Sequence, residues 1–454
     1  MPCGARTFLT VPSVRRGRPT CLPLHDYTTR SFQLRVQITF ASISVVFKKG
    51  CTNYLGKGET MVTAVIFAAF VGVGQAATHE AELIFPFEPF HNHGSSIVQT
   101  PEGDFLACWF HGTGERKADD VRIMGARKRK GDSRWSEPFL MADSQDLPDC
   151  NPVLFVDPRG TLWLFWIAVQ NNEWGGSLLK YRTSTDYSHD GPPKWNWQDV
   201  IHCRPTRLEE LFLKTVEEVE KKYAELLSQN EELRKEIDEV KVAATKKLSQ
   251  RLGWMTRVHP IMTSDKRIML GLYSDVFNCS LAAFTEDWGA TWQFSEPILT
   301  VDLGNIQPAF LKKKDGTIVA LMRDNGFPKR IRRAESHDNG VTWSDVVPMD
   351  IPNPGSSVDA TVLQNGHWVL ICNDTVQGRH ILSAYLSEDE GTTWPYKKRL
   401  EDFPPEKGSG AYPSVIQASD GTIHCTYSYT NRETPGSCIK HAWFNEEWLK
   451  ESGQ

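Results

Sequence analysis

Two histidines, and the seven of the ten cysteines that lie after residue 77, are the residues whose type and spacing first suggest chemistry. His91 and His93 could place two imidazoles on one metal ion, but the sequence positions no third ligand beside them, so we predict no metal site and no cofactor. The cysteines contain no Cys-x-x-Cys pair, which argues against a zinc knuckle or a thioredoxin-type motif. An exported protein could form one or two disulfides among them, but the sequence does not reveal the pairing. They are Cys108, Cys150, Cys203, Cys279, Cys372, Cys425 and Cys438.

Three aspartates recur at a fixed spacing of 51 residues. Asp287, Asp338 and Asp389 each lie in the pattern S/T-x-D-x-G-x-T-W. An aspartate can accept backbone N–H groups across a tight turn, glycine adopts positive φ, and tryptophan packs between strands. We therefore interpret these Asp-box turns as folding elements and not as catalytic motifs.

The elements that must position these residues are six copies of one repeat. Each copy consists of an apolar segment, a tight turn and a second apolar segment. Their turns contain Asp-Gly, Asn-Gly and similar pairs, and their flanks are rich in β-branched and aromatic residues, as is typical of hairpins. Six hairpins at a spacing of about fifty residues predict an all-β, six-bladed β-propeller. A β-sandwich is the alternative, but it gives no reason for the period. The copies lie at 95–110, 151–167, 258–274, 307–323, 358–373 and 412–428.

The charge of the chain is unevenly distributed. The 454 residues contain 51 Lys and Arg against 56 Asp and Glu, a net charge of −5, which argues against a nucleic-acid-binding protein. Residues 1–60 contain nine basic and two acidic residues, +7, so residues 61–454 carry −12. We interpret 1–60 as an over-long start or an unusual leader. The apolar run 62–73 is too short for a permanent membrane span and predicts a signal peptide over 61–77, with residues 78–454 forming a secreted or periplasmic propeller.

One segment, 206–252, departs from the strand pattern. It is dense in Glu, Lys and Leu, and its apolar residues follow the four-three spacing of a coiled-coil seam from Phe212 through Leu226 to Ala244. Both ends must return to the propeller, so we predict a helical hairpin that turns near 228–230. It could pack on itself, cover the substrate entrance or form a homo-oligomer.

The Asp-box turns and the six-blade pattern resemble the sialidase superfamily of bacterial-neuraminidase-repeat propellers, over about residues 83–448. Sialidases use a tyrosine nucleophile assisted by a glutamate, an aspartate acid/base and three arginines that bind the substrate carboxylate. A guanidinium group binds a carboxylate through two hydrogen bonds, and a neutral tyrosine avoids charge repulsion with an anionic sugar.

The resemblance implies roles for individual residues. Tyr412, in Gly-Ala-Tyr-Pro-Ser, corresponds to the nucleophile. Arg323 and Arg379 correspond to two of the arginines, and Arg116, after Gly-Glu, resembles a residue that lines the pocket. The acid/base aspartate is expected in the loop that follows, as Asp119 or Asp120, with a slight preference for Asp120.

The chain departs from the family pattern at two positions. His93 stands where the first arginine of the family is expected. Asn305 or Gln307 stands where the glutamate is expected, and an amide cannot accept the tyrosine proton. His93 could substitute for that base.

Three functions are compatible with these residues. The first is an exported exo-glycosidase that removes a terminal sialic acid or a related acidic sugar. The second is a lyase that acts on uronic-acid polysaccharides, with arginines neutralising the carboxylate while His93 and Tyr412 move protons. The third is a propeller that binds glycans without turnover. In each case the partner is a glycan and not a nucleic acid.

Overall fold

The computed structural model describes residues 38–39, 42–43 and 76–451, in two units, Met1–Gly72 and Val73–Gln454. In the first unit, the two described segments, β1 (Ile38–Thr39) and β2 (Ser42–Ile43), pair antiparallel. Most of the predicted signal peptide, residues 61–75, lies outside the described residues. The rest of the description concerns the second unit.

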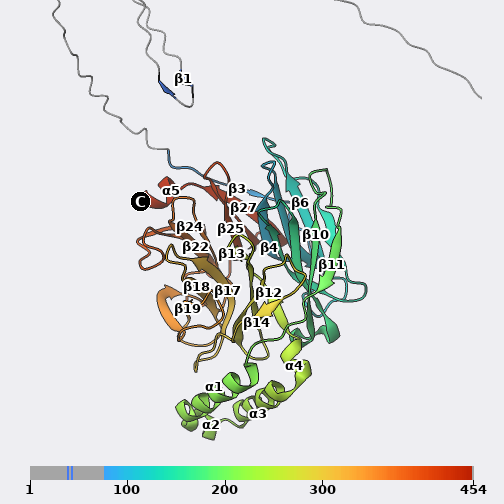
Figure 1. Ribbon diagram of the computed structural model, residues 1–454. Coiled ribbons are helices and arrows are strands. Elements are labelled where there is room, and N and C mark those ends of the chain that lie inside the picture. Colours follow the sequence, from blue (N-terminus) through green and yellow to red (C-terminus); the bar gives the residue numbers. More distant parts are fainter. Residues whose placement is uncertain (1–37, 40–41, 44–75, 452–454) are drawn as a thin grey trace, which may run out of the picture. The chain divides into compact units, whose positions relative to one another are not determined.

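Six antiparallel sheets follow one another along the second unit (Figure 1). Each is a blade whose first strand is innermost, and the six predicted hairpins are confirmed as the first two strands of each blade. The first blade consists of β4 (His91–Gln99), β5 (Phe105–Gly112), β6 (Arg122–Lys128) and β7 (Phe139–Ala142), and the second of β8 (Asp149–Val156), β9 (Leu162–Val169), β10 (Ser177–Ser184) and β11 (Trp197–Val200). The third consists of β12 (Trp254–Thr256) with β13 (Ile261–Met262), β14 (Ile268–Ser274), β15 (Cys279–Thr285) and β16 (Gln293–Phe294), and the fourth of β17 (Asn305–Lys312), β18 (Ile318–Asp324), β19 (Arg330–Ser336) and β20 (Val347–Pro352). The fifth consists of β21 (Asp359–Val362), β22 (Trp368–Cys372), β23 (Ile381–Ser387) and β24 (Tyr396–Asp402), and the sixth of β25 (Gly408–Gln417), β26 (Ile423–Asn431), β27 (Thr434–Phe444) and β3 (His79–Leu83).

The sixth blade contains strands from both ends of the unit. β3 pairs antiparallel with β27, from His79 opposite Phe444 to Leu83 opposite Lys440. The short helix α5 (Glu446–Lys450) follows β27. This pairing completes a four-stranded last blade, so the predicted six-bladed propeller is confirmed and the sandwich alternative is wrong.

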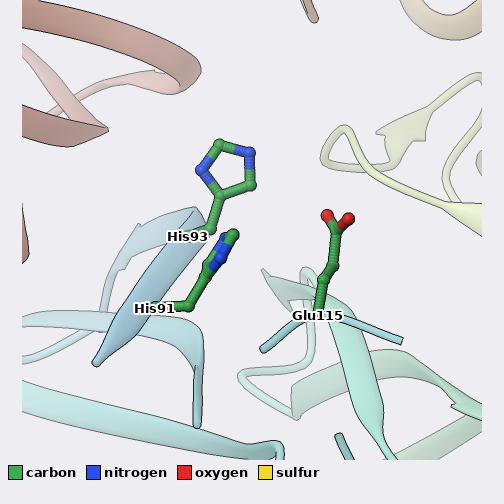
Figure 2. A group of neighbouring side chains, drawn as sticks. All are labelled: His91, His93 and Glu115. Carbon is green, nitrogen blue, oxygen red and sulfur yellow. The ribbon is translucent and has the colours of Figure 1, made fainter. Parts of the chain in front are cut away.

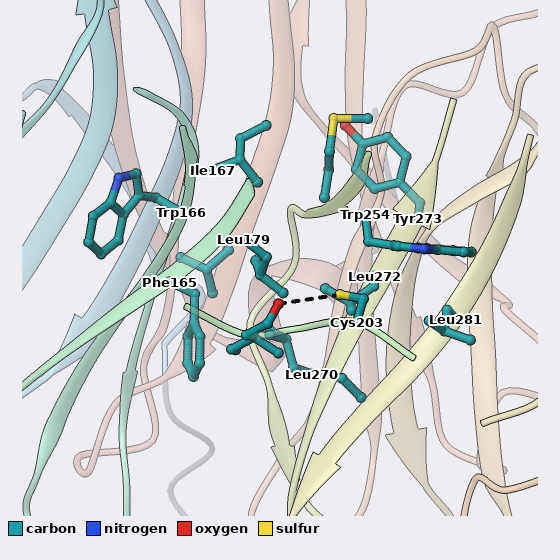
Figure 3. Packing of buried hydrophobic residues seen from close by; sticks show 14 of the residues in the cluster. Phe165, Trp166, Ile167, Leu179, Cys203, Trp254, Leu270, Leu272, Tyr273 and Leu281 are labelled. Carbon is teal, nitrogen blue, oxygen red and sulfur yellow. Dashed lines mark hydrogen bonds between the residues drawn. The ribbon is translucent and has the colours of Figure 1, made fainter. Parts of the chain in front are cut away.

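The core lies between adjacent blades. Every side chain of β9 is buried, and the Phe165 ring lies edge-on to Trp292 of the neighbouring blade, with centroids 6.1 Å apart. Figure 3 shows Phe165 in the cluster of buried residues that the two blades share, which also contains Leu270 and Leu272 of β14. Burial of each large apolar side chain contributes about 1.5–3 kcal/mol. All seven cysteines of the described part of the chain are buried and unpaired, so no disulfide forms among them.

Because the strands of each blade alternate in direction, their connections divide between two faces. The turns that join the first strand to the second, and the third to the fourth, lie on one face, which we call the turn face. The connections from second to third strand, and from one blade to the next, lie on the other face, which we call the cavity face. The Asp-box turns belong to the turn face.

The insertion between β11 and β12 is helical, as predicted for the fold. Its helices α1 (Leu208–Lys222), α2 (Ala224–Gln229), α3 (Glu231–Thr245) and α4 (Lys247–Arg251) form a separate group beside the sheets (Figure 1). A Lys241–Glu220 ion pair and a Gln250–Glu209 hydrogen bond show that the two arms run antiparallel. Within residues 76–451, no helix is long and apolar enough to cross a membrane.

The predicted seam of the insertion is wrong near the turn of the hairpin, where both Leu226 and Asn230 are exposed. Phe212, Ile237 and Ala244 are buried, but Leu226 is 51% exposed while Leu227 is 6% exposed. α1 ends at Lys222 and α2 begins at Ala224, and the non-helical residue between them shifts the apolar face by one residue.

Candidate active site

Four of the innermost strands carry the same irregularity near the cavity face. β4, β8, β17 and β25 each contain a shift in register, and at each shift one residue adopts positive φ. A bulge re-aims a side chain, and a positive φ is costly for any residue other than glycine or asparagine. The residues are Gly94 (φ 63°), Asn151 (φ 52°), Gln307 (φ 56°) and Tyr412 (φ 57°).

A polar cavity of about 690 Å³ opens at this place. Its walls include the innermost strands and the loops of the cavity face. Its ionisable and strongly polar side chains include His91, His93, Glu115, Asp275, Gln307, Arg323, Arg379 and Tyr412.

Tyr412 lies at the base of the cavity and is only 9% exposed. Its hydroxyl accepts a hydrogen bond from the Arg323 guanidinium at 2.8 Å, and the Arg379 guanidinium lies 4.9 Å from its ring centroid. Burial raises the pKa of Tyr412, but Arg323 and Arg379 together outweigh this effect and hold the pKa below its ordinary value. The phenolate form is therefore favoured relative to a free tyrosine.

Arg257 holds the strained backbone below Tyr412, and the sequence analysis missed this residue. It is fully buried and donates hydrogen bonds to the carbonyls of Tyr412 at 2.5 Å, Pro413 at 3.1 Å and Ser95 at 3.2 Å. An arginine within the largely apolar stretch 254–262 was the available signal.

His93, in the position of the missing family arginine, contacts Tyr412 directly. The two ring centroids are 4.2 Å apart. Burial lowers the pKa of His93 well below its ordinary value, and the charges of His91 and the nearby arginines lower it further. His93 is therefore a neutral imidazole that could accept a proton.

The two predicted amides lie in different environments. Gln307 lines the cavity, and its Oε1 lies 3.5 Å from an Arg323 nitrogen. Asn305 is buried beneath it and donates to the Ile298 carbonyl at 2.8 Å, so it does not face the cavity. Within residues 76–451, no carboxylate hydrogen-bonds to the Tyr412 hydroxyl.

The predicted acid/base aspartates and Arg116 do not line the cavity. Asp120 accepts hydrogen bonds from the Thr113 N–H and hydroxyl, and Asp119 accepts one from Asn172 at 2.8 Å. The Arg116 guanidinium stacks over Trp174, which does line the cavity. These contacts fold the loop so that Glu115 faces inward instead.

Two carboxylates that the sequence analysis missed do line the cavity, Glu115 and Asp275. Asp275 is exposed, yet the protein around its carboxyl group displaces water and thereby raises its pKa, against the opposing effect of Arg323 and Arg116. Asp275 thus retains its proton to a higher pH than an ordinary aspartate, as a general acid requires. Its place directly after the apolar strand 268–274 was the only signal in the sequence.

The prediction of no metal site depended on the lack of a third ligand beside His91 and His93. The structure brings Glu115 to them, and the ligand atoms of the three side chains all lie within 4.8 Å of one another (Figure 2). The sequence could not reveal this group because Glu115 follows His93 by 22 positions and reaches it only through the course of a loop.

Comparisons with known proteins agree with this fold. The chain matches the family described as BNR repeat-like domain over residues 103–250 and 244–425. No curated protein matches it.

Several solved structures are similar at low sequence identity. One is a protein of unknown function from Dyadobacter fermentans, with 15% identity and a TM-score of 0.60 over 81% of this chain and 98% of that one. Another is the Hadza microbial sialidase Hz136, with 15% identity and a TM-score of 0.57 over 79% and 66% of the chains. A third is the leech intramolecular trans-sialidase, with 14% identity and a TM-score of 0.59 over 83% and 71%. At these identities the likeness concerns the fold.

Proposed function

The chain belongs to the BNR repeat-like propellers of the sialidase superfamily, and from this membership we propose that it is an exported glycosidase that removes a terminal sialic acid or a related acidic sugar from glycoconjugates. The observation that carries the proposal is the convergence of Arg323 and Arg379 on Tyr412 within one cavity. Two guanidiniums beside a buried tyrosine suit a substrate that brings its own carboxylate. Two of the similar solved structures are named as a sialidase and a trans-sialidase, which supports the same substrate class.

The proposed reaction proceeds in two steps. Arg323 and Arg379 bind the sugar carboxylate, the phenolate oxygen of Tyr412 attacks the anomeric carbon, and the bond to the leaving oxygen breaks as Asp275 gives that oxygen its proton. Asp275 then removes a proton from water, whose oxygen attacks the same carbon and releases Tyr412. This assignment replaces Asp119 and Asp120 with Asp275, because Asp120 accepts hydrogen bonds from Thr113 within its own loop and Asp119 accepts one from Asn172 of the next blade.

The first experiment compares full-length protein with two tyrosine variants. Each is incubated with sialylated mucin and a panel of acidic polysaccharides, and released sugars are identified by mass spectrometry. Tyr412→Phe should lower kcat by about 1000-fold or more, as expected for loss of a nucleophile. Tyr396→Phe, on outer strand β24, is the matched control and should retain full activity.

A second candidate function is favoured by one specific observation. Gln307 stands where a base is expected, while neutral His93 lies against Tyr412. In a uronic-acid lyase, His93 would take the C5 proton, Tyr412 would protonate the leaving O4, and a C4=C5 double bond would form while the arginines stabilise the carboxylate. An ultraviolet-absorbing unsaturated product would establish this reaction, and saturable binding without any product would indicate a glycan-binding propeller.

A further inference from the structure

The His91, His93 and Glu115 side chains converge from two separate elements of the first blade. The histidines lie on β4 and the glutamate lies in the loop between β5 and β6. Figure 2 shows both imidazoles and the carboxylate directed toward one space, and all three side chains line the cavity.

None of the three side chains has a hydrogen-bond or ion-pair partner within the described part of the chain. Two other buried or half-buried histidines of the propeller are paired with carboxylates: His259 with Asp359 at 3.1 Å, and His367 with Glu446 at 2.6 Å. Three strong ligand groups without protein partners, in one polar cavity, form a site that is complete except for its ligand.

Apolar packing fixes the two imidazoles without engaging their nitrogens. The His91 ring stacks on Phe110 with centroids 5.5 Å apart at 20°, and the His93 ring meets Phe110 edge-on at 5.5 Å. Gly94, at φ 63°, permits this packing, since a Cβ there would come within 2.9 Å of the Phe110 ring. The local fold thus holds both imidazoles in place while their nitrogens stay available.

We propose that His91, His93 and Glu115 bind a divalent first-row transition-metal ion, for which Zn²⁺ is the best match. Two imidazole nitrogens and one carboxylate oxygen form a donor set that zinc accepts with a fourth position open to water or substrate. Small side-chain rotations would bring ligand atoms that are up to 4.8 Å apart to bonds of about 2.0–2.2 Å. The open position would face the cavity, where it could bind a sugar hydroxyl or carboxylate oxygen.

This inference goes beyond the proposed function, whose reaction uses no metal ion. Metal binding can also be measured without substrate, so its test is independent of the proposed activity. Full-length protein is treated with chelator, dialysed and titrated with Zn²⁺ by calorimetry, and bound metal is counted by mass spectrometry. We expect one ion per chain. In parallel, Co²⁺ should give the intense visible bands of a tetrahedral site without a thiolate charge-transfer band, which separates this site from the buried cysteines.

Three variants test the assignment. His91→Ala and Glu115→Gln should each weaken Zn²⁺ binding by at least about 100-fold, whereas His202→Ala, at an exposed histidine between β11 and the insertion, should bind as the unchanged protein does. Glu115→Gln preserves the shape of the side chain, and circular dichroism checks its fold. The proposal is overturned if no saturable one-to-one binding occurs, or if Glu115→Gln and His91→Ala bind as tightly as His202→Ala.

Discussion

On the turn face, Asp338 accepts hydrogen bonds from the Ser336 hydroxyl at 2.7 Å, the Thr342 N–H at 2.9 Å and the Thr342 hydroxyl at 2.6 Å. On the cavity face, Arg379 makes one long side-chain hydrogen bond, 3.5 Å to the Gly355 carbonyl, and the Arg323 Nε has no partner among the described residues. The Asp-box carboxylate of the turn face is therefore satisfied by the fold, while charged groups of the cavity face remain available to a ligand. The hydrogen bonds of the turn face stabilise the fold, whereas the unpaired charges of the cavity face cost stability and serve to bind a ligand.

The largest expected effect comes from removing a cavity charge. Arg379→Met keeps the bulk of the side chain but loses the guanidinium, and kcat/KM should fall about 1000-fold, or about 4 kcal/mol, because a charged clamp on the substrate is lost. The free energy of unfolding should stay the same or rise, since Arg379 makes few internal contacts. Steady-state kinetics and urea unfolding check both parts.

The matched control for this variant is Arg399→Met, at an exposed ion pair of β24 with Asp402. It should leave kcat/KM unchanged. A large loss of stability in Arg379→Met would contradict the contrast between the two faces.

The opposite pattern is expected at an Asp-box turn. Asp338→Ala removes acceptors for several hydrogen bonds and should lower the free energy of unfolding by about 2–3 kcal/mol, because the Thr342 N–H and its neighbours lose their partner. The kcat/KM of the folded protein should not change. Urea unfolding compares it with Asp265→Ala, in an exposed turn of the third blade, which should cost less than about 0.5 kcal/mol.

A pH-dependent effect sharpens the account of the turn face. His424 is buried, its ring nitrogen lies 2.9 Å from His441, and burial lowers its pKa to about 3. Between this pH and the ordinary pKa of about 6.5, the unfolded chain binds a proton that the folded chain does not, so stability must fall as the pH falls. From pH 7 to pH 5, His424 alone should lower the free energy of unfolding by about 2 kcal/mol.

His424→Gln should remove that share, so its unfolding free energy should decline less steeply from pH 7 to pH 5 in urea titrations. His202→Gln, at an exposed position, should follow the unchanged protein. Equal slopes for all three proteins would show that His424 is not responsible.

The same division explains what could be predicted from the sequence. The hairpins and Asp-box turns are local, so six copies of one pattern identify the blades and their period. Tyr412 and Arg323 lie on strands of the predicted hairpins and Arg379 lies in the loop that follows one, and the structure brings the three together in one cavity. Glu115 and Asp275 lie on loops whose course depends on contacts between distant segments.

The loop after β5 illustrates the limit. Asp120 satisfies its carboxylate on Thr113 within the loop, and Asn172 of the next blade holds Asp119. No sequence pattern announces either contact. The closure of the last blade by β3 is equally non-local, because Glu82 of β3 pairs with His441 of β27, 359 positions later in the chain.

The helical insertion leaves the propeller on the cavity face, but polar groups in it are satisfied by hydrogen bonds within the protein, as in the Asp-box turns of the turn face. Asn230, between α2 and α3, accepts a hydrogen bond from the Leu233 N–H at 3.0 Å, and Tyr223 hydrogen-bonds to Asp302 of the propeller at 2.6 Å. Asn230→Ala should therefore cost about 1 kcal/mol, felt as faster hydrogen exchange in α3. Because Asn230 lies at the far turn of the hairpin and not in the cavity, kcat/KM should stay unchanged. If kcat/KM falls together with the stability of the helices, the insertion instead acts on the substrate entrance. The insertion would then belong functionally with the cavity face and not with the turn face.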